Sequence, residues 1–300
     1  MNMSNTLKNK IKPLLLSIIL IFTLLIAAIV WFLNLTFSEI EHDHLYDNTF
    51  RTKDALLAVI DNLHMKSADW GSWNDTYEFM ADHNEAYIQS NLGAYSIATL
   101  KLNIIAFLDT KGNLFEKRAI DIDKSQEVTF PTSLISDLVG HKLFFVPGDE
   151  QKSYSGLVEL PEGVMLVSLR PILHSNLSGP VRGTLIFGQY LSERIISQVA
   201  KLVHFDFDIK PYVVTSQSSD YKKALKSPEG DFKYVIKQNT SDGYIIMNDL
   251  LDRPTILVHA IMPRKIHKAG LKVVYIFAAA TALASLLVIL IVYTHFKKRD

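Results

Sequence analysis

The stretch that decides the fold runs from residue 69 to residue 79 and reads Asp69-Trp70-Gly71-Ser72-Trp73-Asn74-Asp75-Thr76-Tyr77-Glu78-Phe79. It holds two of the three tryptophans of the chain. If it forms one helix, four side chains follow the i, i+3, i+4, i+7 spacing and share a face, while Asp75 points away: Trp70, Trp73, Asn74 and Tyr77. Such a face either packs on a sheet or lines a ligand pocket, and packing is the commoner role of aromatics at helical spacing.

Composition narrows the class of protein. The chain has 300 residues, no cysteine and a formal net charge of zero. Balanced charge argues against a nucleic-acid partner, which would favour a basic excess. The lack of cysteine excludes disulfides, thiol nucleophiles and thiolate metal sites. The apolar residues concentrate near the two ends, which points to a membrane protein.

The first apolar stretch, Leu14 to Leu33, contains no charged residue and is long enough to cross about 30 Å of hydrocarbon. Three lysines precede it and three acidic residues follow it: Lys8, Lys10, Lys12, Glu39, Glu41 and Asp43. This asymmetry places the N-terminus in the cytoplasm. A cleaved signal peptide would have an apolar core of only about 7–15 residues and a small-residue cleavage site, so we expect a membrane anchor.

The second apolar stretch, Val273 to Thr294, is also uncharged, and Lys297, Lys298 and Arg299 follow it. The C-terminus is therefore expected in the cytoplasm as well, which leaves residues from about 36 to 270 outside. The lipid bilayer is thus the first expected partner. Because the sequence stops soon after this span, we expect it to be the sensor portion of a longer protein whose output module is missing.

A long helix is expected between the first span and the tryptophan stretch. Residues 36–67 contain no proline or glycine, and their apolar residues recur at helical spacings. At 1.5 Å per residue this helix would be roughly 45–50 Å long, either a rod that transmits motion or an ordinary amphipathic helix. Within it, His42 and His44 point about 200° apart and cannot share a metal ion, so we expect Glu41-His42-Asp43-His44 to be a solvated face near the membrane.

The residues after the tryptophan stretch alternate between strands and turns. A polar connection is expected over 91–99 and a short helix over 132–139. Five strands are expected over 102–108, 114–120, 156–160, 164–169 and 182–190, followed by a helix that begins at Ser192. Five antiparallel strands with a helical insertion match a PAS-like sensor architecture. Four further strands are expected over 205–209, 232–237, 243–247 and 255–261.

The expected fold class is therefore α+β, with two transmembrane helices flanking a PAS/Cache-like extracytoplasmic domain. The expected segments are a cytoplasmic N-terminus (1–13), a transmembrane helix (14–35), a signalling helix (36–67), a PAS-like domain (68–203), a smaller membrane-proximal β region (204–270), a second transmembrane helix (271–294) and the cytoplasmic start of an output module (295–300).

Several blocks of this sequence resemble the CHASE extracellular sensor family, in its fourth class. The blocks are Asp69-Trp70-x-x-Trp73-Asn74-Asp75-Thr76-Tyr77-x-Phe79, Tyr87-Ile88-x-Ser90-Asn91-Leu92, Leu102-Asn103-x-Ile105-Ala106-x-Leu108-Asp109-x-x-Gly112, Gly156-Leu157, Pro161-Glu162-Gly163, Arg170-Pro171-Ile172-Leu173 and Gly179-Pro180-x-Arg182-Gly183-Thr184-Leu185-Ile186-x-Gly188-x-Tyr190-Leu191. They cover roughly residues 50 to 200 in the order of the family, which commonly has Asp where this chain has Asn74. The resemblance implies a periplasmic signal-receiving domain between two membrane spans, ahead of a histidine kinase or of a cyclic-di-GMP cyclase or phosphodiesterase. It implies no particular ligand.

Six residues are candidates for ligand binding: Trp70, Trp73, Asn74, Asp75, Tyr77 and Arg170. Arg170 is the cation best suited to a ligand carboxylate, because a guanidinium binds such a group with two parallel hydrogen bonds. The alternative is an ion pair with Asp69, Asp75 or Asp109. Arg182, beside glycine and proline, is expected to anchor a loop.

No catalytic residues, metal site or cofactor are expected, since none of the common hydrolase, metalloprotease or phosphate-loop motifs is present. The main hypothesis is a membrane-anchored, homodimeric input domain of a bacterial signalling protein in the inner membrane, with a small-molecule or protein ligand in the periplasm. The alternative is an envelope adaptor that binds a protein through its outer domain without signalling.

Overall fold

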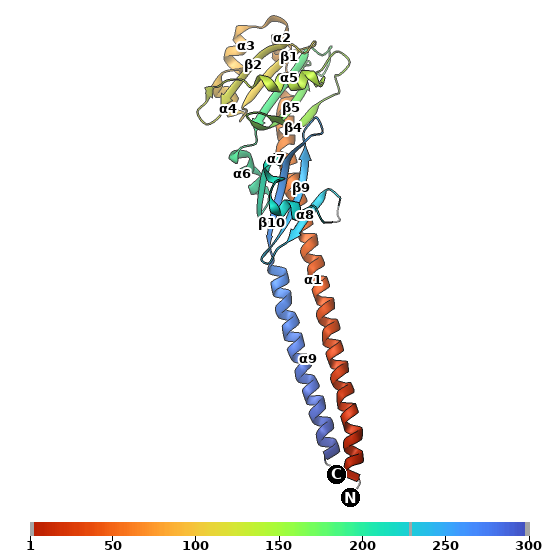
Figure 1. The fold of residues 1–300 in the computed structure, drawn as a ribbon. Coiled ribbons are helices and arrows are strands. Elements are labelled where there is room, and N and C mark those ends of the chain that lie inside the picture. The colour runs from red at the N-terminus through yellow and green to blue at the C-terminus, as the bar shows by residue number, and fades with distance from the viewer. Residues whose placement is uncertain (1–2, 228–229, 298–300) are drawn as a thin grey trace. The chain divides into compact units, whose positions relative to one another are not determined.

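A computed structural model describes residues 3–227 and 230–297 (Figure 1). The chain divides into two compact units. The first contains residues 1–46, 237–241 and 262–300, and the second contains residues 47–236 and 242–261. The expected α+β class is confirmed, since helices and antiparallel strands alternate along the second unit.

The first unit is built from two helices. Helix α1 spans Met3–Gly71, of which the part up to Tyr46 belongs here, and helix α9 spans Lys265–Lys297. Each contains a stretch long and apolar enough to cross a membrane, and almost none of the side chains in these stretches are buried against protein. Two candidate membrane helices therefore flank the sheets, in agreement with the sequence-based expectation.

Helices α1 and α9 meet just outside their apolar stretches. Gly270 lies so close to Phe37 that a Cβ atom on it would be only 2.4 Å from the ring. The Glu41 carboxylate accepts a hydrogen bond of 2.9 Å from Nε of Arg264, and both side chains are largely buried. The expectation that Glu41 belongs to a solvated face is therefore wrong, because its partner lies more than two hundred residues further along the chain.

The second unit contains a six-stranded sheet with the order β3-β2-β1-β6-β5-β4. Its strands are β1 (Ile104–Asp109), β2 (Leu114–Asp121), β3 (Gln126–Glu127), β4 (Tyr154–Leu160), β5 (Gly163–Pro171) and β6 (Gly183–Tyr190). The pairs are antiparallel. All five expected strands are confirmed, and the two-residue β3 is an additional edge strand.

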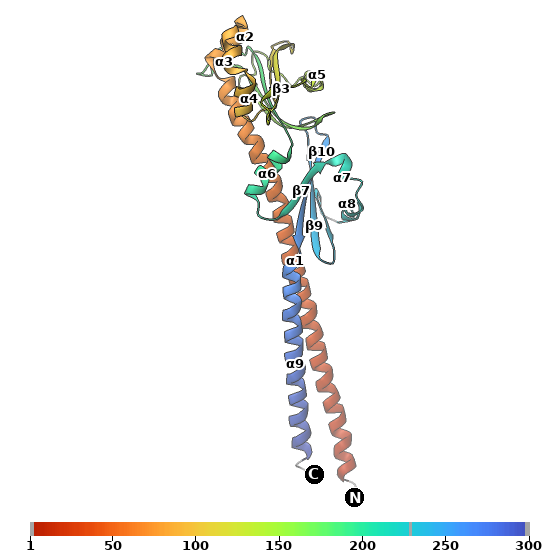
Figure 2. The same cartoon turned by 90° about the vertical axis from the view of Figure 1, so that its left-hand side faces the viewer.

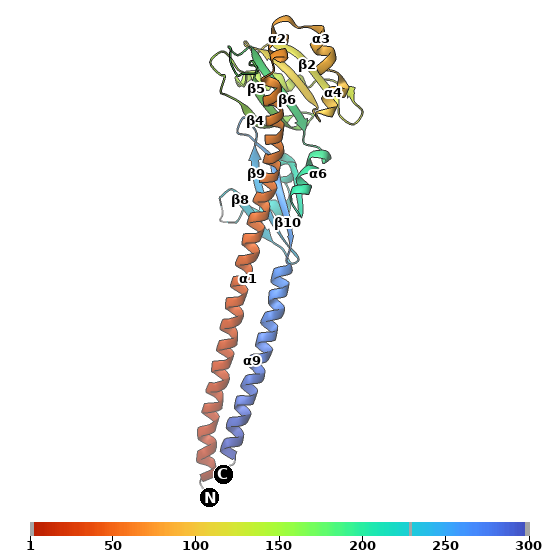
Figure 3. The ribbon, with the colours of Figure 1, turned by 180° about the vertical axis from the view of Figure 1, so that it is seen from behind.

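Strand β5 shows how the two faces of this sheet are covered. Val164 and Leu166 belong to the same apolar cluster as residues of α1, whereas Met165 and Val167 pack with residues of α5 (Thr132–Gly140). This alternation is the period of two that a strand buried on both faces requires. Helix α1 therefore covers one face and α5 the other, and Figure 3 shows α1 crossing β4, β5 and β6.

Three short helices connect α1 to the sheet: α2 (Asn74–Asp82), α3 (Glu85–Asn91) and α4 (Ala94–Thr99). The expectation of a polar connection over 91–99 is wrong for most of that range. Ile97 is fully buried in the α1 cluster, and Ala94 and Ala98 pack against it, so this segment gains a core contact that favours a helical turn.

A second sheet has the order β7-β10-β9-β8. It consists of β7 (Asp206–Pro211), β8 (Phe232–Ile236), β9 (Thr240–Asn248) and β10 (Pro254–Pro263), with helices α6 (Glu193–Leu202), α7 (Tyr212–Thr215) and α8 (Ser219–Ala224). The four expected strands are confirmed. Ile256 and Val258 join the apolar cluster of α1, while Leu257 packs with Tyr221 of α8. Figure 2 shows α1 on one side of β9 and α8 on the other. Both sheets therefore repeat one plan, with α1 on one face and a short helix on the other.

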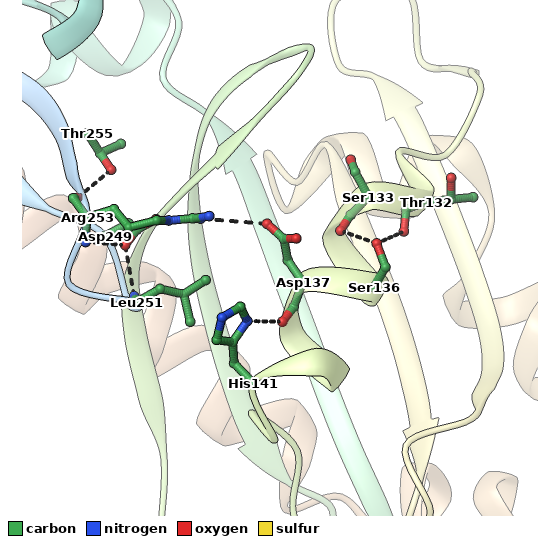
Figure 4. A network of polar contacts seen from close by, with 9 residues as sticks. All are labelled: Thr132, Ser133, Ser136, Asp137, His141, Asp249, Leu251, Arg253 and Thr255. Carbon is green, nitrogen blue, oxygen red and sulfur yellow. Dashed lines mark hydrogen bonds and ion pairs between the residues drawn. The ribbon is translucent and has the colours of Figure 1, made fainter.

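The turn between β9 and β10 joins the second sheet to the first. The buried Asp249 carboxylate accepts hydrogen bonds from the backbone N–H groups of Leu251 and Arg253, both at 2.9 Å. Its other oxygen pairs with the Arg253 guanidinium, which also lies 3.6 Å from a carboxylate oxygen of Asp137 on α5 (Figure 4). The Leu250 N–H donates to the Leu157 carbonyl of β4 at 2.9 Å. These contacts connect the two sheets through one turn.

Candidate functional site

The tryptophan stretch is not one helix. Helix α1 ends at Gly71 and α2 begins at Asn74, with Trp73 between them in an extended conformation (φ −98°, ψ 133°). The expectation that the four side chains share a single helical face is therefore wrong. The Leu173 N–H donates to the Gly71 carbonyl at 2.9 Å, so the segment after β5 satisfies one of the carbonyl groups that the end of a helix leaves without a partner.

Trp70 and Trp73 nevertheless stay together. Their rings stack with centroids 5.2 Å apart, and Trp70 also meets the edge of Phe187 from β6 at 5.7 Å. Trp70 is 9% exposed and Trp73 is 36% exposed. Trp70 is thus a core residue of the face that α1 covers, and Trp73 shields it from solvent.

Asn74 is bonded to a neighbouring loop and does not line an open pocket. Its Oδ1 atom accepts hydrogen bonds from the Ser175 N–H at 3.0 Å and from His174 Nδ1 at 3.1 Å. Its own N–H donates to the Ser175 hydroxyl at 3.2 Å. The side chain therefore fixes the start of α2 to the loop that links β5 and β6.

Tyr77 fastens the other end of the same loop. Its hydroxyl donates to the Pro180 carbonyl at 3.2 Å, and the Arg182 guanidinium lies 3.9 Å above its ring. Nη1 of Arg182 donates to the Tyr77 carbonyl at 2.9 Å, which confirms Arg182 as a loop anchor. Gly183 follows, and a Cβ atom there would lie 2.2 Å from the Leu108 carbonyl oxygen. The motif residues of both segments thus form one structural corner.

Asp75 lies apart from this corner. Its side chain is exposed and borders a shallow hollow of about 260 Å³ with Glu78, Asn84 and Tyr87. The Tyr87 hydroxyl is hydrogen-bonded to the Thr76 hydroxyl at 2.8 Å, and burial raises the pKa of Tyr87 to about 12. The structure therefore does not bring Asp75 together with Trp70, Tyr77 and Arg170.

Arg170 lies on the face of β5 that α1 covers, beside a row of small polar groups. The Ser67 and Ser168 hydroxyl oxygens are 2.6 Å apart and both side chains are fully buried. His64 Nδ1 lies 3.0 Å from the Ser168 hydroxyl, and His64 Nε2 lies 3.4 Å from the Ser153 hydroxyl. We call these five residues, His64, Ser67, Ser153, Ser168 and Arg170, the polar seam.

Each serine hydroxyl in the polar seam has a single proton to donate, and this decides which group is the donor in each hydrogen bond. The Ser67 hydroxyl donates to the His64 carbonyl at 2.8 Å, so its single proton is used. The Ser168 hydroxyl must then donate to Ser67, and His64 must donate to Ser168 through Nδ1–H. Nε2 of His64 remains an acceptor for Ser153, and burial, followed by the Arg170 charge, lowers the pKa of His64. The seam therefore holds a neutral histidine in one defined tautomer.

Arg170 itself is short of partners. Its Nε atom is buried and has no hydrogen-bond acceptor, and no ion pair or hydrogen bond joins its side chain to any residue in 3–227 or 230–297. The alternative of an ion pair with Asp69, Asp75 or Asp109 is therefore absent from the described residues. The Arg170 Cβ atom lies 3.1 Å from where a Cβ atom on Gly71 would be, which places the arginine at the last turn of α1. Burial lowers the pKa of Arg170, while the Asp61 charge acts in the opposite direction.

The polar seam differs from a nucleophile-activating triad in the group that faces Nδ1 of His64. An activating histidine needs a group behind Nδ1 that stabilises the imidazolium, usually a carboxylate. Here Ser168 takes that place, and the charge of Arg170 disfavours an imidazolium. Sequence reasoning found Arg170 but missed His64, Ser67, Ser153 and Ser168. One signal was available, because Ser168 interrupts the apolar run Val164-Met165-Leu166-Val167 of a buried strand.

Two candidate membrane helices flank a domain of antiparallel sheets that α1 covers, and this arrangement is that of a sensor domain anchored between two membrane spans. The CHASE4 domain family matches residues 55–210, and the chain belongs to this family. This match confirms the resemblance found in the sequence.

Known proteins similar to this chain include the methanogenesis regulatory histidine kinase FilI of Methanothrix harundinacea (strain 6Ac), which is 31% identical over 254 residues. The alignment covers 84% of this chain and 28% of FilI, so the chain spans less than a third of the length of that relative.

Two solved structures align with most of this chain at low sequence identity. The extracellular domain of vpHK1S-Z8, described as a histidine kinase, has a TM-score of 0.49 at 11% identity and covers 78% of this chain and 94% of its own. The periplasmic domain of Vibrio cholerae LuxQ has a TM-score of 0.46 at 11% identity and covers 73% of this chain and 99% of its own. At such scores the fold assignment depends on the strand order of the chain itself.

Proposed function

We propose that this chain is the input part of a membrane-anchored signal-transduction protein whose output module is a histidine kinase or a cyclic-di-GMP enzyme. The observation that carries the proposal is a CHASE4 domain placed between two helices that can cross a membrane. The similarity to FilI, which is named as a regulatory histidine kinase, favours the kinase.

In this proposal residues 14–35 and 271–294 cross the bilayer, both termini lie in the cytoplasm and residues from about 36 to 270 lie outside. The charge asymmetry around each span supports this orientation. The outer part receives a small molecule or a protein, and a homodimer transmits the change. A ligand needs only a difference in affinity between two states of the protein to shift their populations.

The route of the signal runs along α1 and through the start of α9. Helix α1 continues from its apolar stretch to the polar seam without a break, and Phe37, Glu41, Arg264 and Gly270 join it to α9 within the first unit. A change in the packing of α1 would therefore alter its contacts with α9 next to the apolar stretches of the two helices.

A reporter fusion tests the proposal. Residues 1–300 are joined to the dimerisation and catalytic domains of a histidine kinase, and autophosphorylation is measured in membranes. The proposal predicts kinase activity that changes when Glu41→Gln removes the charge pair with Arg264. The matched control is Asp43→Asn, because Asp43 is exposed on the same helix. Activity that is unaffected by either substitution, in a fusion that does not dimerise, would contradict the proposal and would favour a non-signalling adaptor.

A further inference from the structure

We infer that the polar seam binds the carboxylate group of a small monoanionic ligand, which fills the vacant donors of Arg170. This inference rests on the proposed function, because it names the class of molecule that the input domain receives. Three properties of the seam support it: its hydrogen bonds, its charge and its place on α1.

The first step is that Arg170 carries donors without acceptors. A guanidinium offers five N–H groups, and a buried donor without an acceptor destabilises a protein. Arg182 shows the usual arrangement in this chain, since it donates to a carbonyl and covers an aromatic ring. Arg170 makes neither kind of contact within the described residues, and its Nε atom is nevertheless buried. The two Nη atoms, which are not buried in this way, therefore have no acceptor within the described residues and are the donors that a ligand can reach.

The second step is the charge of the surroundings. His64 is neutral in its assigned tautomer, and Asp61 is an exposed carboxylate one turn earlier on α1. Asp61 acts on Arg170 and on His64 through space but pairs with neither. The seam therefore carries one unneutralised positive charge with a negative charge nearby. A monoanion matches this balance, whereas Asp61 would repel the second charge of a phosphate or sulfate.

The third step is that planar carboxylates suit a guanidinium in particular. Two parallel hydrogen bonds can form between the two groups, and they are stronger than bonds between neutral groups. The neighbouring Ser153 and His64 side chains are partly exposed, so further polar atoms of the ligand have donors and acceptors within reach. Ser67 and Ser168 are fully buried, so a ligand can reach the seam only beside the partly exposed His64, Ser153 and Arg170.

The fourth step connects binding to α1. His64, Ser67 and Gly71 lie on one face of this helix at spacings of three and four residues, and this face meets Ser168 and Arg170 of β5. An anion bound to Arg170 would also remove the charge that opposes protonation of His64. Binding therefore moves the pKa of His64 back towards its ordinary value of 6.5, so protons are taken up at mildly acidic pH, and the two charged groups that act on His64 are Asp61 and Arg170.

The experiment uses the full chain in detergent or nanodiscs and measures binding by calorimetry and by thermal unfolding. The probes are sodium acetate and sodium benzoate, with sodium chloride and sodium phosphate as anion controls at equal ionic strength. We expect saturable binding of both carboxylates and none of phosphate. Arg170→Gln should weaken binding about tenfold or more, as expected for the loss of a charge-assisted pair. The control Arg194→Gln, at an exposed arginine that pairs with Asp123, should bind like the wild type.

Proton uptake gives a second readout. In buffers of different ionisation enthalpy, wild-type protein should take up protons on binding acetate, and His64→Asn should not, because asparagine keeps the donor to Ser168 but cannot titrate. Without ligand, Arg170→Gln should leave the melting temperature unchanged or higher, since it removes a charge that has no partner. A clear fall in melting temperature, phosphate binding as tight as acetate, or equal acetate binding by Arg170→Gln would overturn the inference.

These results are separate from those of the kinase fusion. A fusion that responds to Glu41→Gln while no carboxylate binds would retain the proposed function and overturn the inference alone. Carboxylate binding at Arg170 in a protein whose fusion never signals would overturn the proposed function and retain the site.

Discussion

Gly183 has almost no room for a side chain. A Cβ atom there would lie 2.2 Å from the Leu108 carbonyl oxygen, and a backbone atom in the middle of a sheet cannot move aside. We therefore expect Gly183→Ala to reduce the free energy of unfolding by about 3 kcal/mol or more. Gly140→Ala is the control, because no atom lies within 4 Å of its Cβ position at the end of α5.

The control substitution should change stability by no more than about 0.5 kcal/mol, or raise it slightly, since alanine is the better helix former. Urea unfolding of the two variants, followed by tryptophan fluorescence, measures both effects. Equal stability of Gly183→Ala and wild type would show that the corner formed by Tyr77 and Arg182 is looser than described.

His64 makes stability depend on pH in one direction. Burial and then Arg170 lower the pKa of His64 in the folded protein below its ordinary value of 6.5, so the unfolded chain takes up a proton first on acidification. The contribution of His64 is complete above about pH 6.5 and is lost as the pH falls from there through the folded pKa. Melting temperatures between about pH 8 and pH 5 should therefore fall less in His64→Asn than in wild type.

The comparison variant for this measurement is His204→Asn, because His204 is exposed at the end of α6. It should keep the pH dependence of the wild type. If His64→Asn keeps it too, the imidazole is not held neutral by its neighbours.

At the scale of elements, the turn between β9 and β10 contains an ion pair, Asp249–Arg253, whose two side chains differ in burial. The Asp249 carboxylate is buried, whereas the Arg253 side chain is close to half exposed. Arg253→Ala leaves a buried carboxylate with backbone donors alone, so we expect a loss of about 1.5–3 kcal/mol of unfolding free energy. Arg194→Ala removes an exposed pair and should cost less than about 1 kcal/mol.

Hydrogen exchange locates the effect of Arg253→Ala. Faster exchange is expected at the Leu250 N–H, which bonds to β4, and at the amide groups of α5, because Arg253 reaches Asp137 there. If exchange changes only within β9 and β10, the turn does not connect the two sheets.

The elements show what the sequence could predict. Strand β5 was predictable because its alternation is local, with Val164 and Leu166 on one face and Met165 and Val167 on the other. The break after Gly71 was not, because the group that donates a hydrogen bond to the Gly71 carbonyl is the N–H of Leu173, about a hundred residues away.

The same holds for the site. Arg170 was predictable from the chemistry of its guanidinium. Its lack of a partner was not predictable, since Asp69, Asp75 or Asp109 could have paired with it. Glu41 appeared to be a solvated acid because Arg264 is distant in sequence. For Glu41 a contact of long sequence separation decided the outcome, whereas for Arg170 the lack of one did.

At the scale of the whole molecule, the orientation in the membrane is open to direct measurement. The chain has no cysteine, so single cysteines can be placed without background labelling. Tyr95 is 78% exposed on α4, and Tyr95→Cys should react with a membrane-impermeant maleimide added to intact cells. Asn9→Cys, which precedes the first apolar stretch, should react only after the cells are permeabilised.

A third position completes this test. Leu24→Cys lies within the apolar stretch and should stay unlabelled in both conditions, because the charged thiolate that reacts does not form in hydrocarbon. Labelling of Tyr95→Cys from the cytoplasmic side alone would contradict the proposed orientation. Labelling of Leu24→Cys in intact cells would contradict the membrane span itself.

The unbroken run of α1 has a consequence for how any response must depend on chain length. The helix contains 69 residues, and each residue inserted into it turns everything that follows by about 100°. Inserting one or two alanines after Asp54 would therefore rotate the seam out of phase with the membrane segment, whereas seven would nearly restore the angle. The kinase activity of the reporter fusion, plotted against the number of inserted residues, should therefore oscillate with a period of about 3.6 residues.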